Sequence, residues 1–352
     1  MPRFAVVEGV GRDAERQARG ECRRDVPARH GNLSGMTGMT SASSSPLALA
    51  IDFGGTKIAV GVVAPDGTVV DATEVRTPAG QGAEAIAATL TKAAGDVLAG
   101  PHGARVAVVG VCSAGPVDVR TGTASPLNVS DWREFPLMER VAAIAPGLPS
   151  AFALDGVALA AAELAYGGAK DHRDALVITV STGIGGGLIL DGQVRAGQSG
   201  NAGHIGHLVV DVDGPECACG GRGCVEAIAS GTSIARWAVD NGWQGEPATA
   251  ALAEAARAGD ELALAAFDRA ARALAAAIAG TAALADIEVA VLSGGVTQVG
   301  EVLFEPLRRH LAEHAGLSYI RGITVVPSPL GRSACLLGAA RLAFAALPDP
   351  IA

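Results

Sequence analysis

The stretch LALAIDFGGTKIAVGVV, residues 47–63, places a glycine-rich turn between two apolar runs. Two apolar runs joined by adjacent glycines are typical of a β-hairpin. Glycine lets the backbone approach a ligand that a side chain would exclude, and the N–H groups of such a turn form a concavity for an anion. The turn therefore predicts a phosphate site, although glycine-rich hairpin turns are more often purely structural. The residues that would line this site are Asp52, Gly54, Gly55, Thr56 and Lys57.

The same pattern returns in ALVITVSTGIGGGLIL, residues 175–190, where Thr182 and Gly183 occupy the turn. A strand follows each turn, which excludes the Walker A loop and the dinucleotide fingerprint, because both of those lead into a helix. A third glycine pair, Gly294 and Gly295, ends a later apolar run. The repeated hairpin predicts a duplicated architecture with a ligand between the two halves.

The remaining segments alternate between apolar strands and amphipathic helices. We expect a helix over residues 83–99, a buried strand over 106–111 and mostly helix from 230 to 286. A further helix is expected from about residue 299 to 314, and a last one over 334–347. Strands that alternate with helices in this way predict an α/β fold.

Composition limits the classes of function that the chain can have. It has 352 residues, 49% of them hydrophobic, which suffices for two domains with their own cores. The net charge of −9 makes a nucleic-acid surface unexpected. The most apolar helical segment, residues 274–285, is interrupted by Gly280 and Thr281, so we expect no membrane span.

The first 45 residues differ from the rest of the chain. They show little hydrophobic periodicity and end in a tract rich in Gly, Ser and Thr. We interpret them as a disordered leader, or as the product of a start assigned too early, with Met36 or Met39 as the true start. We expect them to be dispensable for folding. The apolar core of a signal peptide is missing, so we expect a cytoplasmic location.

The segment HIGHLVVDVDGPECACGGRGCVE, residues 204–226, contains a close group of metal-ligand types. His207, Cys217, Cys219 and Cys224 have the spacing H-x9-C-x-C-x4-C. Three thiolates and one imidazole make a closed tetrahedral set, the ligand count of a structural zinc. Closely spaced cysteines in a cytoplasmic protein favour a metal over a disulfide. The alternative is a group of buried cysteines without metal.

Three segments together resemble the ROK family of sugar kinases and sugar-responsive repressors, within the actin-like ATPase superfamily. They are DFGGTK at 52–57, STGIGGG at 181–187 and the cysteine segment, and the likeness extends from about Leu47 to Leu347. The resemblance implies two actin-like (ribonuclease H-like) α/β ATPase domains with a cleft between them for ATP, with Mg²⁺, and a sugar. The two glycine turns and the later glycine pair would lie on the nucleotide side.

The resemblance also implies domain boundaries. Residues 46–154 with 334–347 would form the N-terminal domain, and residues 155–333 the C-terminal domain with a helical segment for homodimerisation. The zinc would be structural, with no open coordination position. Its loop would present the sugar pocket, to which Glu226 and His207 would contribute.

Asp155 is the residue that the resemblance identifies as the catalytic base. It follows an apolar run at the start of a helical segment, and Glu163 keeps the family's spacing of eight residues. Phosphoryl transfer to a sugar hydroxyl needs a carboxylate that accepts the proton, and Asp155 would also contact the sugar. An isolated Asp in this position is otherwise a common helix N-cap.

Three positions depart from the family pattern and bear on the choice of sugar. Leu154 and Val157 replace two Asn residues, and His204 replaces a Glu that contacts the sugar. Histidine at that position resembles some bacterial N-acetylmannosamine kinases, whereas glucose is the common substrate of the family. The segment VCSAGPVD at 111–118 also departs from a family motif, although Gly115, Pro116 and Val117 of that motif are retained. The sequence leaves glucose and N-acetylmannosamine as alternatives.

Two classes of function remain. A sugar kinase is favoured because the DFGGTK turn is complete, whereas regulators of the family tend to lose its residues. Regulators also carry a helix-turn-helix module ahead of the sugar domain, and we expect that the short leader cannot supply one. The alternative is a sugar-sensing regulator without its DNA-binding module. A paralogue that has lost activity would also explain the His204 exchange.

Overall fold

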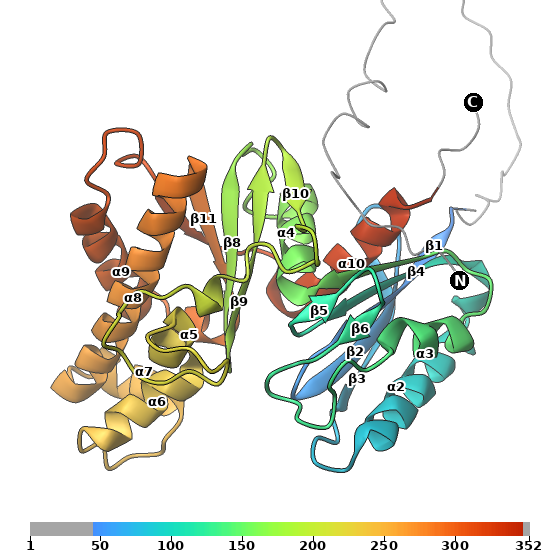
Figure 1. The fold of residues 1–352 in the computed structure, drawn as a ribbon, viewed down its shortest axis with the longest axis horizontal. Coiled ribbons are helices and arrows are strands. Elements are labelled where there is room, and N and C mark those ends of the chain that lie inside the picture. Colours follow the sequence, from blue (N-terminus) through green and yellow to red (C-terminus); the bar gives the residue numbers. More distant parts are fainter. Residues whose placement is uncertain (1–44, 348–352) are drawn as a thin grey trace, which may run out of the picture.

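The computed structural model describes residues 45–347, and two five-stranded sheets form its framework (Figure 1). Each sheet begins with an antiparallel hairpin and continues through two parallel strands. The matching strand orders confirm the duplication predicted from the two hairpins. The first sheet has the order β3-β2-β1-β4-β7, with β1 (Leu47–Phe53), β2 (Lys57–Val63), β3 (Val69–Arg76), β4 (Val106–Ser113) and β7 (Ser150–Leu154). The second has the order β10-β9-β8-β11-β12, with β8 (Ala175–Val180), β9 (Ile184–Leu190), β10 (Gln193–Arg195), β11 (Val289–Ser293) and β12 (Thr324–Pro327).

Helices cover each sheet and complete its core. On the first sheet, α2 packs against β2, β3 and α3, while Trp132 stacks between Phe53 and Phe135 at ring-centroid distances of 3.9 and 4.0 Å. In the second unit, α8 contacts α5, α6, α7 and α9 and is buried along one face. These helices are α2 (Ala83–Leu98), α3 (Leu137–Ile144), α5 (Val225–Ala229), α6 (Gly231–Asp240), α7 (Thr249–Arg257), α8 (Glu261–Ala285) and α9 (Glu301–His314). A small hairpin joins β5 (Val117–Asp118) and β6 (Thr123–Ala124).

The two units exchange a helix at their junction. α4 (Asp155–Tyr166) follows β7 of the first sheet but packs on β8 and β9 of the second. α10 (Ala334–Ala345) follows β12 of the second sheet but packs on β1 and β4 of the first, as its red ribbon shows in Figure 1. The two helices approach closely because Gly338 has no side chain: a Cβ there would lie 1.7 Å from the carbonyl oxygen of Ala158.

Most of the expected elements are present. The helix expected over 83–99 is α2, and the strand expected over 106–111 is β4, which continues to Ser113. The helical region from 230 to 286 consists of three helices, because Gly242 and Gly259 adopt positive φ angles that end the first two. The leader lies outside the described residues.

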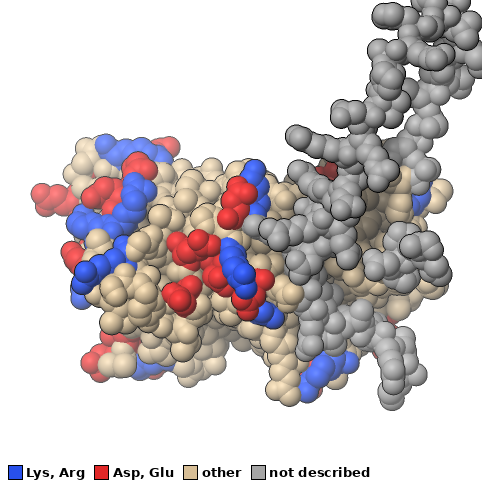
Figure 2. All heavy atoms as spheres, turned by 90° about the horizontal axis from the view of Figure 1, so that it is seen from above, with Lys and Arg blue, Asp and Glu red and all other residues tan. Residues whose placement is uncertain are grey.

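Charged side chains are spread over the surface. On the face shown in Figure 2, acidic and basic groups lie close to one another, and the exposed ion pairs include Arg173–Asp191 at 2.7 Å. Pairs of this kind contribute little to stability, because solvent screens them. Between residues 45 and 347, none of the helices has the length and apolar character needed to cross a membrane.

Candidate functional site

Two carboxylates lie where strands of the first sheet end. Asp52 is near the end of β1, and Asp155 is the first residue of α4, directly after β7. Both strands run parallel to β4, so their carboxyl ends lie at the same edge of the sheet, the edge at which α/β proteins bind ligands. The Cys112 thiol of β4 lies between the two strands, with its Sγ 3.5 Å from Asp52 Oδ1.

Burial changes the acidity of both groups. It raises the pKa of Asp52 to about 6, although the hydrogen bond from Cys112 and the charge of Lys57 act in the opposite direction. Burial also raises the pKa of Asp155 to about 7, and the carboxylates of Asp52 and Glu226 add to the rise. The backbone N–H of Gly156 donates to Asp155 Oδ1 at 2.7 Å and partly offsets these effects. A carboxyl group with a pKa near neutrality suits a general base.

The first glycine turn connects β1 and β2. Gly54 N–H donates to the carbonyl of Lys57 at 2.9 Å, and Thr77 Oγ1 donates to the carbonyl of Gly54 at 2.8 Å. The Lys57 ammonium group, expected beside a phosphate, forms an ion pair with Glu74 of β3 at 2.5 Å. The Lys57 ammonium group therefore lies at the turn as expected, but its partner in the structure is the Glu74 carboxylate.

Asn128 was not identified from the sequence, although it lies against this turn. A Cβ on Gly55 would lie only 2.1 Å from Asn128 Nδ2, so the amide occupies the space that the glycine leaves open. Arg133 supports the loop of Asn128 by donating to the carbonyls of Pro126 and Val129 at 3.0 and 2.8 Å. A single Asn in a loop carries no sequence signal that would distinguish it from an ordinary turn residue.

The second glycine turn connects β8 and β9 and is held by the start of α6. Gly231 N–H donates to the carbonyl of Ser181 at 2.8 Å, and Thr232 Oγ1 donates to the carbonyl of Thr182 at 2.9 Å. The later glycine pair lies next to it: a Cβ on Gly294 would lie 2.3 Å from the carbonyl oxygen of Val180, at the end of β8. The structure thus brings these two sequence-predicted segments together.

Glu226 links the cysteine segment to this second turn. Its Oε2 accepts a hydrogen bond from the backbone N–H of Ile184 at 2.8 Å. Asp155 approaches the same hairpin, since its Oδ1 lies 3.5 Å from the position of a Cβ on Gly185. Both predicted acidic residues therefore flank the start of β9.

His204 lies beside His207, with ring centroids 4.7 Å apart in an edge-to-face arrangement. Burial, with a smaller contribution from His207, lowers the pKa of His204 to about 4. Gly115 is in contact with this group: a Cβ there would lie 3.3 Å from His204 Cε1 and 2.4 Å from Leu154 Cδ1. Leu154 is fully buried, so its side chain packs beneath Gly115.

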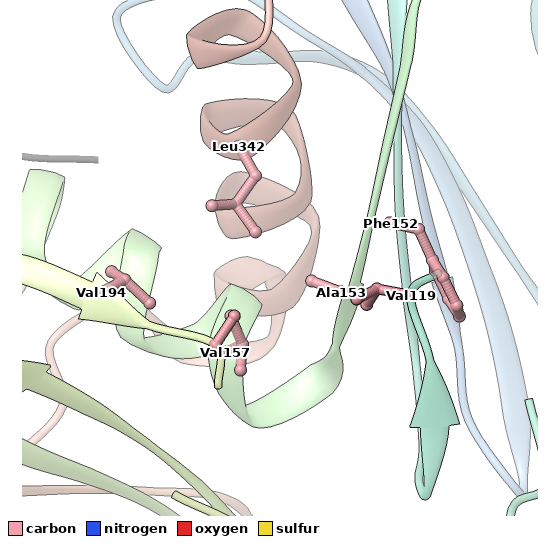
Figure 3. A pocket seen from close by; sticks show the side chains of 7 residues that line it. Val119, Phe152, Ala153, Val157, Val194 and Leu342 are labelled. Atoms are coloured by element: carbon pink, nitrogen blue, oxygen red, sulfur yellow. The ribbon is translucent and has the colours of Figure 1, made fainter. Parts of the chain in front are cut away.

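Two residues that follow Asp155 within α4 have structural roles elsewhere. Val157 lines an apolar crevice with Phe152, Val194 and Leu342, and none of the site's carboxylates belongs to it (Figure 3). Glu163 is fully buried and accepts hydrogen bonds from Gly168 N–H and the Ser328 hydroxyl. The Val157 exchange therefore fills the interface between α4, β7, β10 and α10 rather than the candidate site.

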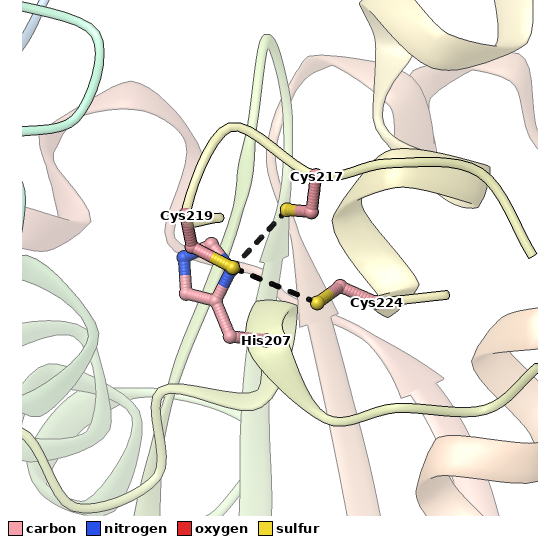
Figure 4. Close-up of side chains that lie close together, drawn as sticks. All are labelled: His207, Cys217, Cys219 and Cys224. Atoms are coloured by element: carbon pink, nitrogen blue, oxygen red, sulfur yellow. Dashed lines mark hydrogen bonds between the residues drawn. The ribbon is translucent and has the colours of Figure 1, made fainter. Parts of the chain in front are cut away.

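The four expected metal ligands lie together. The ligand atoms of His207, Cys217, Cys219 and Cys224 are all within 4.8 Å of one another, and their side chains point toward a common centre (Figure 4). The distances Cys217 Sγ to His207 Nδ1 and Cys219 Sγ to Cys224 Sγ are both 3.7 Å. Ligand atoms of a tetrahedral zinc with Zn–S bonds of about 2.3 Å lie about 3.8 Å apart, so the donor set fits this metal.

The cluster also determines where Glu226 lies. Cys224 is buried, with 2% of its surface exposed, and directly precedes α5, in which Glu226 is the second residue. Gly223 adopts a φ of +69°, and a Cβ there would lie 1.6 Å from the carbonyl oxygen of Asp211. The tight path of the loop therefore leads directly into the helix that presents the carboxylate.

Comparison with known proteins gives four related findings. A family model described as the ROK family matches residues 48–346. The chain is 38% identical over 302 residues to an N-acetylmannosamine kinase of Yersinia pseudotuberculosis, covering 85% of this chain and 99% of that protein. Its fold matches a ROK family glucokinase from Streptomyces griseus, solved with glucose and AMPPNP, at 34% identity and a TM-score of 0.74, covering 85% of this chain and 99% of that one. It also matches a ROK family transcriptional regulator, a homologue of the E. coli MLC protein, at 25% identity and a TM-score of 0.75, covering 85% of this chain and 78% of that one.

Proposed function

Because the chain belongs to the ROK family, we propose that it is an ATP-dependent sugar kinase, which transfers the γ-phosphoryl group to the 6-hydroxyl of a hexose or N-acylhexosamine. The observation that supports this most is the position of Asp155. It is the first residue of α4, lies beside the β8–β9 hairpin, and has a pKa near neutrality. A carboxylate so placed can accept the proton of an attacking hydroxyl.

The proposed roles of the other residues follow from where they lie. The backbone of the first and second glycine turns and of Gly294 and Gly295 would hold the phosphates between the two sheets. Mg²⁺ bound with ATP supplies positive charge to the phosphates, and Asp52 is, with Asp155, one of the two carboxylates at the edge where β1 and β7 end. Asp155 would take the hydroxyl proton, while Glu226 and His204 would hold the sugar ring.

The zinc-ligand set would act through structure rather than chemistry. His207 and the three cysteines would use all four tetrahedral positions, which leaves none for substrate. We propose that a bound zinc keeps the loop rigid and so places Glu226 and His204. A homodimer through the helical segment, the domain division at residue 155 and a cytoplasmic location remain predictions of this proposal.

A coupled assay of ADP formation tests the kinase proposal directly. The purified chain should turn over ATP with at least one of glucose, mannose, fructose, N-acetylglucosamine and N-acetylmannosamine. The Yersinia relative is named an N-acetylmannosamine kinase and the Streptomyces relative a glucokinase, so both names support a sugar from this set. If none of the five sugars were phosphorylated, the kinase proposal would be wrong.

The likeness to a transcriptional regulator favours one alternative, a sugar-sensing protein without catalysis. Such a protein would bind a sugar, and its melting temperature would rise with sugar concentration, because a ligand stabilises the folded state that binds it. Sugar binding without phosphorylation would therefore support the alternative over the kinase.

His204→Glu should shift sugar preference toward glucose by about tenfold relative to N-acetylmannosamine. The change replaces a half-buried imidazole beside Gly115 and Leu154 with a carboxylate, which accepts strong hydrogen bonds from sugar hydroxyls. Comparing kcat/KM for the two sugars measures the shift. His314→Glu, the same exchange at an exposed position at the end of α9, is the matched control. An unchanged ratio in His204→Glu would show that His204 does not contact the sugar.

A further inference from the structure

Glu226 occupies one side of the second glycine turn. Its Oε2 accepts the backbone N–H of Ile184 at 2.8 Å, and the position of a Cβ on Gly183 lies 2.6 Å from the same oxygen. A side chain at Gly183 would therefore collide with the carboxylate. The need for a glycine at position 183 is therefore explained without a phosphate, because the carboxylate of Glu226 already fills the space beside it.

The carboxylate and the turn are both attached to the same pair of helices. The carbonyl of Glu226 accepts hydrogen bonds from Ser230 N–H at 3.2 Å and from Ser233 Oγ at 2.9 Å, at the junction of α5 and α6. Gly231, which directly follows Ser230, donates its N–H to the carbonyl of Ser181 in the turn at 2.8 Å. The distance between the carboxylate and the turn is thus determined by a short, hydrogen-bonded path.

One oxygen of the carboxylate remains available. Within residues 45–347, the bond from Ile184 is the one protein hydrogen bond that the side chain accepts, and it uses Oε2. The side chain is half-buried rather than enclosed, so Oε1 can accept from a ligand hydroxyl. A single carboxylate can therefore contact a sugar with one oxygen and the phosphate turn with the other.

We propose that Glu226 is a positioning residue that holds the second glycine turn in the form that binds nucleotide phosphates, and that it couples nucleotide affinity to the presence of the sugar. The proposal rests on the function proposed above. A sugar hydroxyl on Oε1 would fix the orientation of the carboxylate and so order the N–H of Ile184. The nucleotide then binds a turn that is already ordered, and by linkage the nucleotide raises sugar affinity by the same factor.

Nucleotide binding without sugar tests the positioning role. Titration calorimetry with AMPPNP and Mg²⁺ should show about tenfold weaker binding in Glu226→Ala than in the wild type, because a hydrogen bond to a charged acceptor is lost. Glu226→Gln keeps an oxygen acceptor for Ile184 and should weaken binding by only a few-fold. Glu216→Ala removes an exposed glutamate from the same loop and is the matched control.

A double-mutant cycle tests whether Gly183 and Glu226 act together. Gly183→Ala alone should displace the carboxylate and weaken AMPPNP binding about as much as Glu226→Ala does. In the Glu226→Ala background the new Cβ has space, so the same substitution should have little further effect. Additive effects of the two substitutions would overturn the proposal.

The coupling is measured by repeating the AMPPNP titrations with glucose and with N-acetylmannosamine. One of the two sugars should tighten AMPPNP binding to the wild type several-fold, and Glu226→Ala should lose this gain. If the wild type bound AMPPNP equally well with and without either sugar, or if Glu226→Ala bound it as the wild type does, the positioning proposal would fail while the kinase proposal stood. If the wild type bound no AMPPNP at all, the kinase proposal would fail as well.

Discussion

Asp155→Asn should lower turnover by about 10²–10⁴-fold while AMPPNP binding stays close to that of the wild type. Asparagine keeps the size of the side chain and an oxygen for the Gly156 N–H, but it cannot accept a proton. The phosphate contacts proposed for the two glycine turns use backbone groups that the substitution does not touch. Single-turnover phosphorylation and calorimetry together measure the two effects.

The dependence of kcat/KM on pH provides a second test of Asp155 as the general base. The pKa of Asp155 is raised to about 7, first by burial and then by the neighbouring Asp52 carboxylate. The active base is the deprotonated form, so kcat/KM should rise as pH increases through about 7 and level off above it. The residual activity of Asp155→Asn should lack this rise. Asp171→Asn, at an exposed position after α4, is the control. Unchanged turnover in Asp155→Asn would show that another group accepts the proton.

Cys224→Ser should reduce the zinc content from about one ion per chain to nearly none. The residue is buried and directly precedes the helix of Glu226, so loss of the metal should also loosen that helix. Structural zinc sites contribute several kcal/mol to folding, which in a protein of this size corresponds to a decrease of about 5 °C or more in melting temperature. We expect the KM for sugar to rise more than kcat falls.

Elemental analysis and thermal unfolding of the same preparations check the zinc prediction. Cys112→Ser provides the matched control, because it removes a buried thiol of β4 that lies outside the cluster and should leave the zinc content unchanged. A wild-type protein that contained no zinc in any preparation would show that the four side chains gather without a metal. Full zinc content in Cys224→Ser would show that this thiolate is not a ligand.

Local sequence patterns predicted most of the framework. The hairpins could be predicted because their strands and glycine turns are contiguous, as in residues 47–63. The four expected metal ligands could be grouped because they lie within eighteen positions. The helix boundaries shifted where glycines with positive φ, such as Gly242, interrupt an otherwise helical composition.

Contacts between distant segments could not be predicted in the same way. The pairing of Lys57 with Glu74 depends on the register of β2 against β3, and the position of Asn128 over Gly55 depends on how separate loops meet in three dimensions. The sequence predicts that the Val157 exchange changes the site, whereas that side chain packs with Val194 and Leu342, which lie 37 and 185 residues further along the chain. The spacing of residues along the chain does not predict which distant segments come into contact in the fold.

The exchange of α4 and α10 has a consequence for synthesis on the ribosome. All five strands of the second sheet lie between residues 175 and 327, so that unit is complete as soon as this stretch has emerged. The first sheet is translated earlier, but its β1 and β4 face waits for Ala334–Ala345, which leave the exit tunnel after the strands of both sheets. We therefore expect the usual order of cotranslational folding to be inverted, with the N-terminal sheet maturing after the C-terminal one. Nascent chains held on the ribosome by a linker that follows residue 333 and fills the exit tunnel should resist proteolysis in the second sheet and be cleaved in the first, and equal protection of both would argue against this order.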